Sequence, residues 1–167
     1  MNVIILIIHQ CDTFEFVFPF KITSTTKPND MNPTIKNILA VVAGVIIGGA
    51  LNMGIIMLSS SVIPPPEGAD LKTMEGLKAA MPLMEPKHFL MPFLAHALGT
   101  LLGAMVTAGL AATQKMRLAM IVSAWFLLGG IINIIMLPSP IWFTLVDLIF
   151  AYLPMGYLAC KLMLKNN

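Results

Sequence analysis

Charged residues are scarce in this sequence. Ten of its 167 residues are Lys or Arg and eight are Asp or Glu, or 11% of the chain, against about 25% in ordinary soluble domains. Apolar residues make up 57%, a composition typical of a protein that lies in a bilayer. The net charge of +2 is too small and too scattered to indicate nucleic acid as a partner.

Cysteine and the common enzyme motifs are also lacking. The two cysteines, Cys11 and Cys160, lie far apart, so the sequence indicates neither a disulfide framework nor a cysteine metal site. The sequence contains no GxSxG, HExxH, GxxxxGK[ST] or GxGxxG motif, and these are the patterns that carry hydrolytic, zinc and nucleotide chemistry. We therefore predict no catalytic residue and no cofactor.

What the sequence does contain is long apolar runs. A helix needs about 20 apolar residues to cross a hydrocarbon core, and four runs have this length: residues 37–58, 88–113, 118–137 and 141–163. A loop over 59–87 separates the first two, and short turns separate the others. The sequence thus predicts an all-α integral membrane four-helix bundle in one domain, residues 31–167. Pro154 should kink the fourth span because it removes a backbone donor.

Residues 1–30 fit this scheme poorly. The apolar run 3–8 is too short for a span, and 24–30 resembles a linker. We interpret this segment as a non-native or disordered N-terminal extension, and expect the native chain to begin at Met31.

The orientation follows from the positive charges at the span ends. The side of the two termini has five cationic residues, and the loop side has Lys72, Lys78 and Lys87 among four acids. By the positive-inside rule, we expect a multi-pass protein of the inner (plasma) membrane with both termini in the cytoplasm. The acidic loop, which includes Asp70 and a short helix to Ala80, would then lie outside.

One polar residue in each span lies toward the loop side of the membrane. These residues are Asn52, His96, Asn133 and Asp147, and each lies within about 12 Å of that face at 1.5 Å rise per residue. Ionisable groups inside a membrane are costly and often functional, so one interpretation is a titratable His96–Asp147 pair supported by the two amides. The alternative is structural: Asp147 meets water at the interface, while neutral His96 bonds to Asn52 and holds the bundle together.

Glycines repeat at helix-packing spacing in the first two spans. Gly44 and Gly48 form one GxxxG step and Gly99 and Gly103 another, and such steps let helix backbones approach closely. We expect these faces to support a homo-oligomer or a contact with another membrane protein.

A third pattern lies at the loop side of the second span. Met81, Met84, His88 and Met91 are spaced by three, four and three residues, and thioether and imidazole ligands suit Cu(I). Methionine is abundant throughout the chain, with 14 residues, and commonly serves as flexible packing. Both interpretations stay open.

Four segments carry a general resemblance. GGALNM at 48–53, PPPEGADL at 64–71, AHALGTLLGA at 95–104 and LPSPIWF at 137–143 resemble segments of small four-span bacterial membrane proteins, over about residues 36–163. The resemblance implies the same topology and no activity, substrate or site. The function we predict is a structural or accessory role with an unknown partner. The alternatives are a small transporter or proton-linked permease that uses His96 and Asp147, and external handling of Cu(I).

Overall fold

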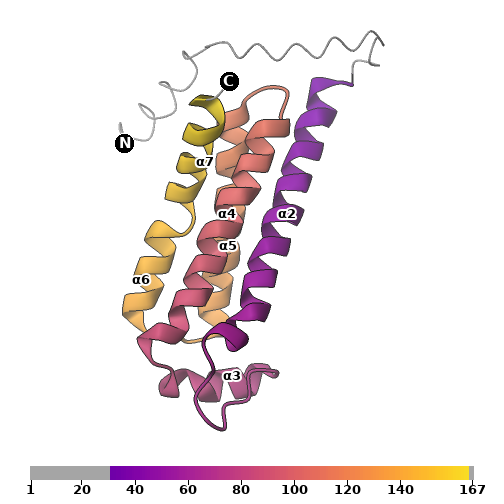
Figure 1. Cartoon of the computed structure of the whole chain (residues 1–167). Coiled ribbons are helices and arrows are strands. Elements are labelled where there is room, and N and C mark those ends of the chain that lie inside the picture. Colours follow the sequence, from indigo (N-terminus) through magenta and orange to yellow (C-terminus); the bar gives the residue numbers. More distant parts are fainter. Residues whose placement is uncertain (1–30, 166–167) are drawn as a thin grey trace.

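Four long helices stand side by side in the structure. The computed structural model describes residues 31–165, so the predicted extension over residues 1–30 lies outside the described residues. The helices are α2 (Pro33–Val62), α4 (Leu90–Leu110), α5 (Lys115–Met136) and the pair α6 (Ile141–Phe150) and α7 (Leu153–Lys165), which together form the fourth span (Figure 1). The chain is all-α and multi-pass, and the predicted four-helix membrane bundle is confirmed.

A short helix closes one end of the bundle. The chain between α2 and α4 carries α3 (Met74–Ala80) and two 3₁₀ turns, Met81–Leu83 and Pro86–Phe89. Figure 1 shows α3 at the end where α2 stops, while α2 begins and α7 ends at the opposite end. The described chain therefore starts and finishes on the same side of the bundle.

Hydrogen bonds that the side chains of Asp70 and Thr73 accept define the start of α3. Asp70 accepts hydrogen bonds from the backbone N–H of Lys72 at 2.8 Å and from the hydroxyl of Thr73 at 2.9 Å. The Thr73 hydroxyl in turn accepts from the N–H of Gly76 at 3.0 Å, which is an N-cap bond. The hydrogen bond from the Lys72 N–H has the larger effect and the bond from the Thr73 hydroxyl the smaller one, and together they hold the pKa of Asp70 below its ordinary value.

Helices α2 and α4 meet through the two glycine steps. A methyl group at Gly48 would lie 2.5 Å from the carbonyl oxygen of Gly99, and one at Gly103 would lie 2.8 Å from the carbonyl oxygen of Gly44. The hydroxyl of Thr107 donates to the carbonyl oxygens of Gly103 at 2.9 Å and Ala40 at 3.3 Å. The two glycine steps therefore pack against each other within this chain, and the expected contact with a second chain or another membrane protein stays a prediction.

The start of α2 is fixed to the turn between α4 and α5. The side-chain oxygen of Asn37 accepts hydrogen bonds from the backbone N–H groups of Ala112 at 2.9 Å and Thr113 at 3.2 Å, and its amide donates to the Thr113 hydroxyl at 2.9 Å. Gln114 completes this turn in a left-handed conformation with φ of 50°. One amide thus satisfies backbone donors of a turn that would otherwise depend on water.

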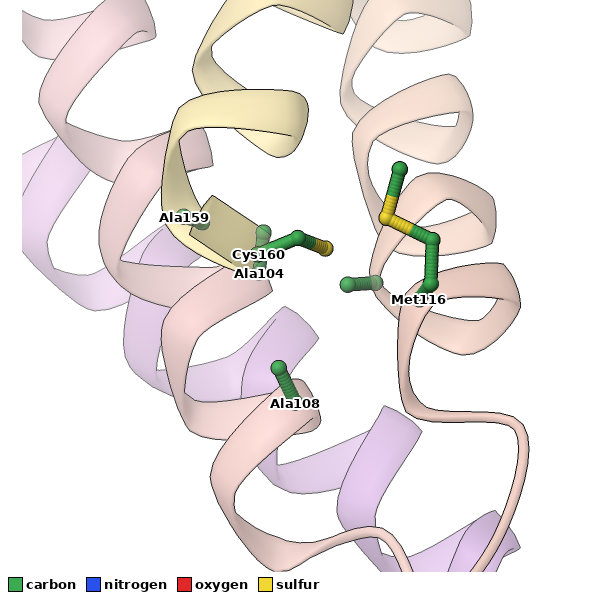
Figure 2. Close-up of a cluster of buried hydrophobic side chains, with 6 residues drawn as sticks. Ala104, Ala108, Met116, Ala159 and Cys160 are labelled. Carbon is green, nitrogen blue, oxygen red and sulfur yellow. The ribbon is translucent and has the colours of Figure 1, made fainter. Parts of the chain in front are cut away.

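Small side chains fill the core near this turn. Figure 2 shows buried residues of α4, α5 and α7 meeting in one cluster, which consists of Ala104, Ala108, Met116, Ala119, Ala159 and Cys160. Alanine at the contacts lets the helix backbones come close, as is common in membrane bundles.

Candidate functional site

The strongest contact between ionisable groups inside the bundle joins α4 to α6. Nδ1 of His96 lies 2.9 Å from each carboxylate oxygen of Asp147. Asp147 is 2% exposed and His96 is 15% exposed by side chain. The structural alternative, in which His96 bonds to Asn52 and Asp147 meets water at the interface, is therefore not the arrangement found.

Tyr152 completes this group, and the sequence analysis did not identify it. Its hydroxyl donates a hydrogen bond of 2.9 Å to the second carboxylate oxygen of Asp147, and its ring stacks on His96 with centroids 5.7 Å apart. Gly130 of α5 provides the space, because a methyl group there would overlap the Tyr152 hydroxyl. The buried carboxylate thus accepts from both an imidazole and a phenol, and such bonds to a charged acceptor are strong.

An interruption of the fourth span places Tyr152 over Asp147. The chain leaves helical geometry at Ala151 and Tyr152, between α6 and α7. Pro154 follows two residues later and has no N–H to donate to the carbonyl of Phe150. The predicted kink at Pro154 is confirmed as a break just before the proline. Broken helices at membrane depth are tolerated where they are buried in protein or line a cavity.

A cavity of about 860 Å³ lies at the loop end of the bundle and reaches this group. All four predicted polar residues line it: Asn52, His96, Asn133 and Asp147. Tyr152 lines it as well, and the loop residues Asp70 and Lys72 lie at its wall. The size is within the range of pockets that hold small molecules.

The two amides line the cavity without joining the pair. No hydrogen bond links Asn52 or Asn133 to His96 or Asp147 within residues 31–165, so the predicted supporting bonds are not present. Oδ1 of Asn52 is buried and has no partner among the described residues, and the same holds for the hydroxyl of Thr100. A buried polar atom without a partner is rare, and because Oδ1 of Asn52 is itself buried, it is not open to a molecule in the cavity.

The predicted copper ligands also line the cavity. Met81, Met84, His88 and Met91 all contribute to its wall. However, Nδ1 of His88 accepts from the N–H of Glu85 at 2.9 Å, and Nε2 donates to the carbonyl of Pro64 at 3.1 Å. A copper ion would have to displace one of these bonds, so Cu(I) binding stays a prediction that this arrangement does not favour.

Apolar and aromatic side chains form much of the rest of the cavity wall. Phe89 packs against Phe143 with centroids 4.8 Å apart and against Trp142 at 5.6 Å. Phe89, Phe126 and Phe143 line the cavity. The site therefore combines an apolar wall with a few polar groups at its inner end, as binding pockets commonly do.

No family model, curated protein or solved structure matches this chain.

Proposed function

We propose that this membrane protein is a small permease that binds a solute in the cavity and couples binding to protonation of the His96–Asp147 pair. One observation carries the proposal: the 2.9 Å contact between His96 and Asp147 forms part of the wall of a cavity of about 860 Å³. A buried carboxylate beside an imidazole changes its net charge when one proton binds or leaves, and buried charge is expensive. A solute that changes this charge balance therefore changes proton affinity as well.

The interrupted fourth span supports a transport role. Transporters often place their sites at discontinuous helices near the membrane midplane. In this chain Asp147 lies in the last turn of α6 and Tyr152 lies in the break itself. Movement of α7 relative to α6 would change the bond from Tyr152 to the carboxylate, so we infer a hinge at this break, next to the titratable pair.

The structural or accessory role predicted from the sequence is the second candidate. It requires a partner surface and makes no use of a cavity. The described helices expose many large apolar side chains, such as Ile46 and Ile135, but lipid covers such faces in any membrane protein. The cavity and the buried pair are explained by a solute site and not by an accessory role, so we favour the permease.

Proteoliposomes test the proposal directly. Purified protein is reconstituted into vesicles that contain a pH-sensitive dye, and solutes of four kinds are added in turn: organic cations, organic anions, zwitterions and neutral molecules. We expect at least one kind to change the internal pH in wild-type vesicles. Asp147→Asn should abolish this change because the variant lacks the carboxylate whose charge couples solute binding to proton binding.

Two glycine variants separate blockage of the cavity from general damage. Gly129 lines the cavity and a side chain there would meet open space, so Gly129→Phe should fill the cavity and stop the flux. Gly49 of α2 also has open space beside it and does not line the cavity, so Gly49→Phe should behave as wild type. If no solute gives a flux that depends on Asp147, the proposed function is wrong.

A further inference from the structure

The charges around the cavity restrict the kind of solute. Within the membrane-spanning helices, Asp147 is the one acidic residue among the described residues that line the cavity, and no Lys or Arg of these helices lines it. Lys72 lies at the wall in the loop, where Asp70 offsets its charge. When His96 is neutral, the inner end of the cavity therefore has a net charge of −1. A cation restores neutrality there, and an anion adds to the cost of the buried charge.

The hydrogen bonds of His96 indicate which atom meets the solute. Nδ1 lies at the carboxylate of Asp147, so in the neutral ring Nδ1 carries the proton and Nε2 has the free lone pair. Nε2 has no hydrogen-bond partner among the described residues. Oδ1 of Asn52 also lacks a partner, but this atom is itself buried. Nε2 accepts a hydrogen bond, so a complementary solute donates one to it.

The cavity wall indicates the rest of the solute. Phe89, Phe126 and Phe143 line it together with aliphatic residues and methionines. A hard metal ion such as Na⁺ or Ca²⁺ requires several oxygen ligands, whereas both oxygens of Asp147 are already bonded to His96 or Tyr152. Aromatic faces attract organic cations, and an apolar body buries well against this wall.

We propose, on the basis of the function proposed above, that the solute is an apolar molecule with a protonated amine. The ammonium N–H donates to Nε2 of His96, and the aryl or alkyl body lies against the phenylalanines. The imidazole stays neutral and bonded to Asp147, so the ammonium charge balances the carboxylate across the ring.

A proton competes with the amine for the same lone pair. Protonation at Nε2 makes His96 a cation, removes its last acceptor and neutralises the site without any solute. An amine that binds to a site in which Nε2 is protonated therefore displaces that proton to the aqueous phase, and a proton can return when the amine leaves. The other titratable or charged groups at the cavity are Tyr152 beside Asp147, His88 near the mouth, and Asp70 and Lys72 in the loop. The described residues of α2 and α5 that line the cavity contribute the amides Asn52 and Asn133 and no charge.

Three probes with one apolar body test the assignment. Radiolabelled 4-phenylbutylamine is bound to the protein in lipid nanodiscs, and unlabelled amine, 4-phenylbutanol and 4-phenylbutyrate are used as competitors. We expect the amine to compete at least tenfold better than the alcohol and the carboxylate not to compete. The affinity should fall as the pH is lowered, because the proton competes for Nε2 of His96 while the aliphatic ammonium keeps its charge.

Variants locate the binding. Asp147→Asn and His96→Gln should each lower the amine affinity at least tenfold. His96→Gln should also remove the pH dependence of the affinity, and Gly129→Phe should remove saturable binding. Gly49→Phe should bind as wild type. Circular dichroism and size-exclusion profiles check that each variant is folded. If Asp147→Asn does not fold, His96→Gln alone tests the role of the pair.

The outcomes distinguish this inference from the proposed function. Equal competition by the alcohol, better competition by the carboxylate, or amine binding that Gly129→Phe leaves intact would overturn the amine assignment. If the amine does not bind but another kind of solute gives a flux that depends on Asp147 in vesicles, the assignment is wrong and the permease stands. If no solute gives such a flux, both are wrong.

Discussion

The Tyr152 hydroxyl is one of two donors to a carboxylate that lies inside the bundle. Its bond to Asp147 is 2.9 Å long, and Tyr152 itself is 1% exposed. Water cannot easily replace a donor in such a place, so removal of the hydroxyl leaves the carboxylate with an unmet acceptor. Hydrogen bonds to charged groups contribute about 1.5–3 kcal/mol.

We therefore expect Tyr152→Phe to lower the free energy of unfolding by about 1.5–3 kcal/mol. The measurement is denaturant-induced unfolding in detergent, followed by circular dichroism. Tyr157→Phe is the matched control, because Tyr157 is 42% exposed in α7, shortly after the break, and it should change stability little. Equal stability of Tyr152→Phe and wild type would show that the phenol bond contributes nothing.

Part of this residue group could be predicted from the sequence and part could not. An ionisable residue in an apolar run stands out by its cost, and counting from the span ends placed His96 and Asp147 at similar depth. Tyr152 is five residues after Asp147, which on a continuous helix is roughly 140° away around the axis. The break at Ala151 removes that separation, and Pro154 predicted a kink but not the position of the ring.

At the scale of helices, α2 and α4 depend on four glycines. The distances from Gly48 to the carbonyl of Gly99 and from Gly103 to that of Gly44 leave no room for a side chain. The GxxxG pattern indicates a close helix contact, and it does not say which helix is the partner. For this reason the sequence suggested a second chain, whereas the chain pairs its two glycine steps with each other.

Gly48→Leu should therefore separate α2 from α4. Overpacking of a close contact typically costs about 1–3 kcal/mol, and we expect a loss of at least this size in the unfolding free energy. Gly54→Leu, on the same helix but with open space beside it, is the control and should leave stability unchanged. Thermal unfolding of the three proteins in one detergent makes the comparison, and similar melting temperatures for the two variants would contradict this packing.

The loop helix α3 should loosen in acid. The pKa of Asp70 is lowered by the N–H of Lys72 and then by the hydroxyl of Thr73. The Asp70 carboxyl thus holds its proton less tightly in the folded loop than in the unfolded loop. The stabilisation of the folded loop by the ionised carboxylate is therefore fully present above the ordinary pKa of 3.8. It is lost as the pH falls through the lowered pKa of the folded loop.

Hydrogen exchange of the 70–80 segment measures this effect. We expect faster exchange on acidification, after correction for the intrinsic pH dependence of exchange, and we expect Asp70→Asn to exchange faster already at neutral pH. Glu67→Gln, an exposed acid in the same loop, is the control. If Asp70→Asn protects the segment as well as Asp70 does, the carboxylate does not stabilise the start of α3.

For the whole molecule, the number and order of the spans could be predicted, because length and apolarity decide both. The cavity could not be predicted. The cavity depends on how α2, α5 and the 59–87 loop surround the loop ends of α4 and α6, and no local sequence pattern describes that arrangement. The pattern of charges predicts which compartment the loop end of the cavity faces.

By the positive-inside rule, the positive charges near the span ends predict that the described termini lie in the cytoplasm. Lys36, Lys115, Arg117, Lys161 and Lys165 lie on that side, and the loop side combines its three lysines with four acids. The cavity is lined by loop residues such as Asp70 and Lys72, so we expect its mouth to open away from the cytoplasm. A solute would then reach His96 from outside in this resting arrangement.

Cysteine labelling in intact cells tests this orientation. Glu67→Cys in the loop should react with a maleimide that cannot cross membranes, and Gln114→Cys in the opposite turn should react only after the cells are opened. The chain without either substitution measures the background from Cys11 and Cys160. The reverse pattern would place the cavity mouth in the cytoplasm, and the amine and the proton would then enter the site from the cell interior, so the direction of the proposed flux would be reversed.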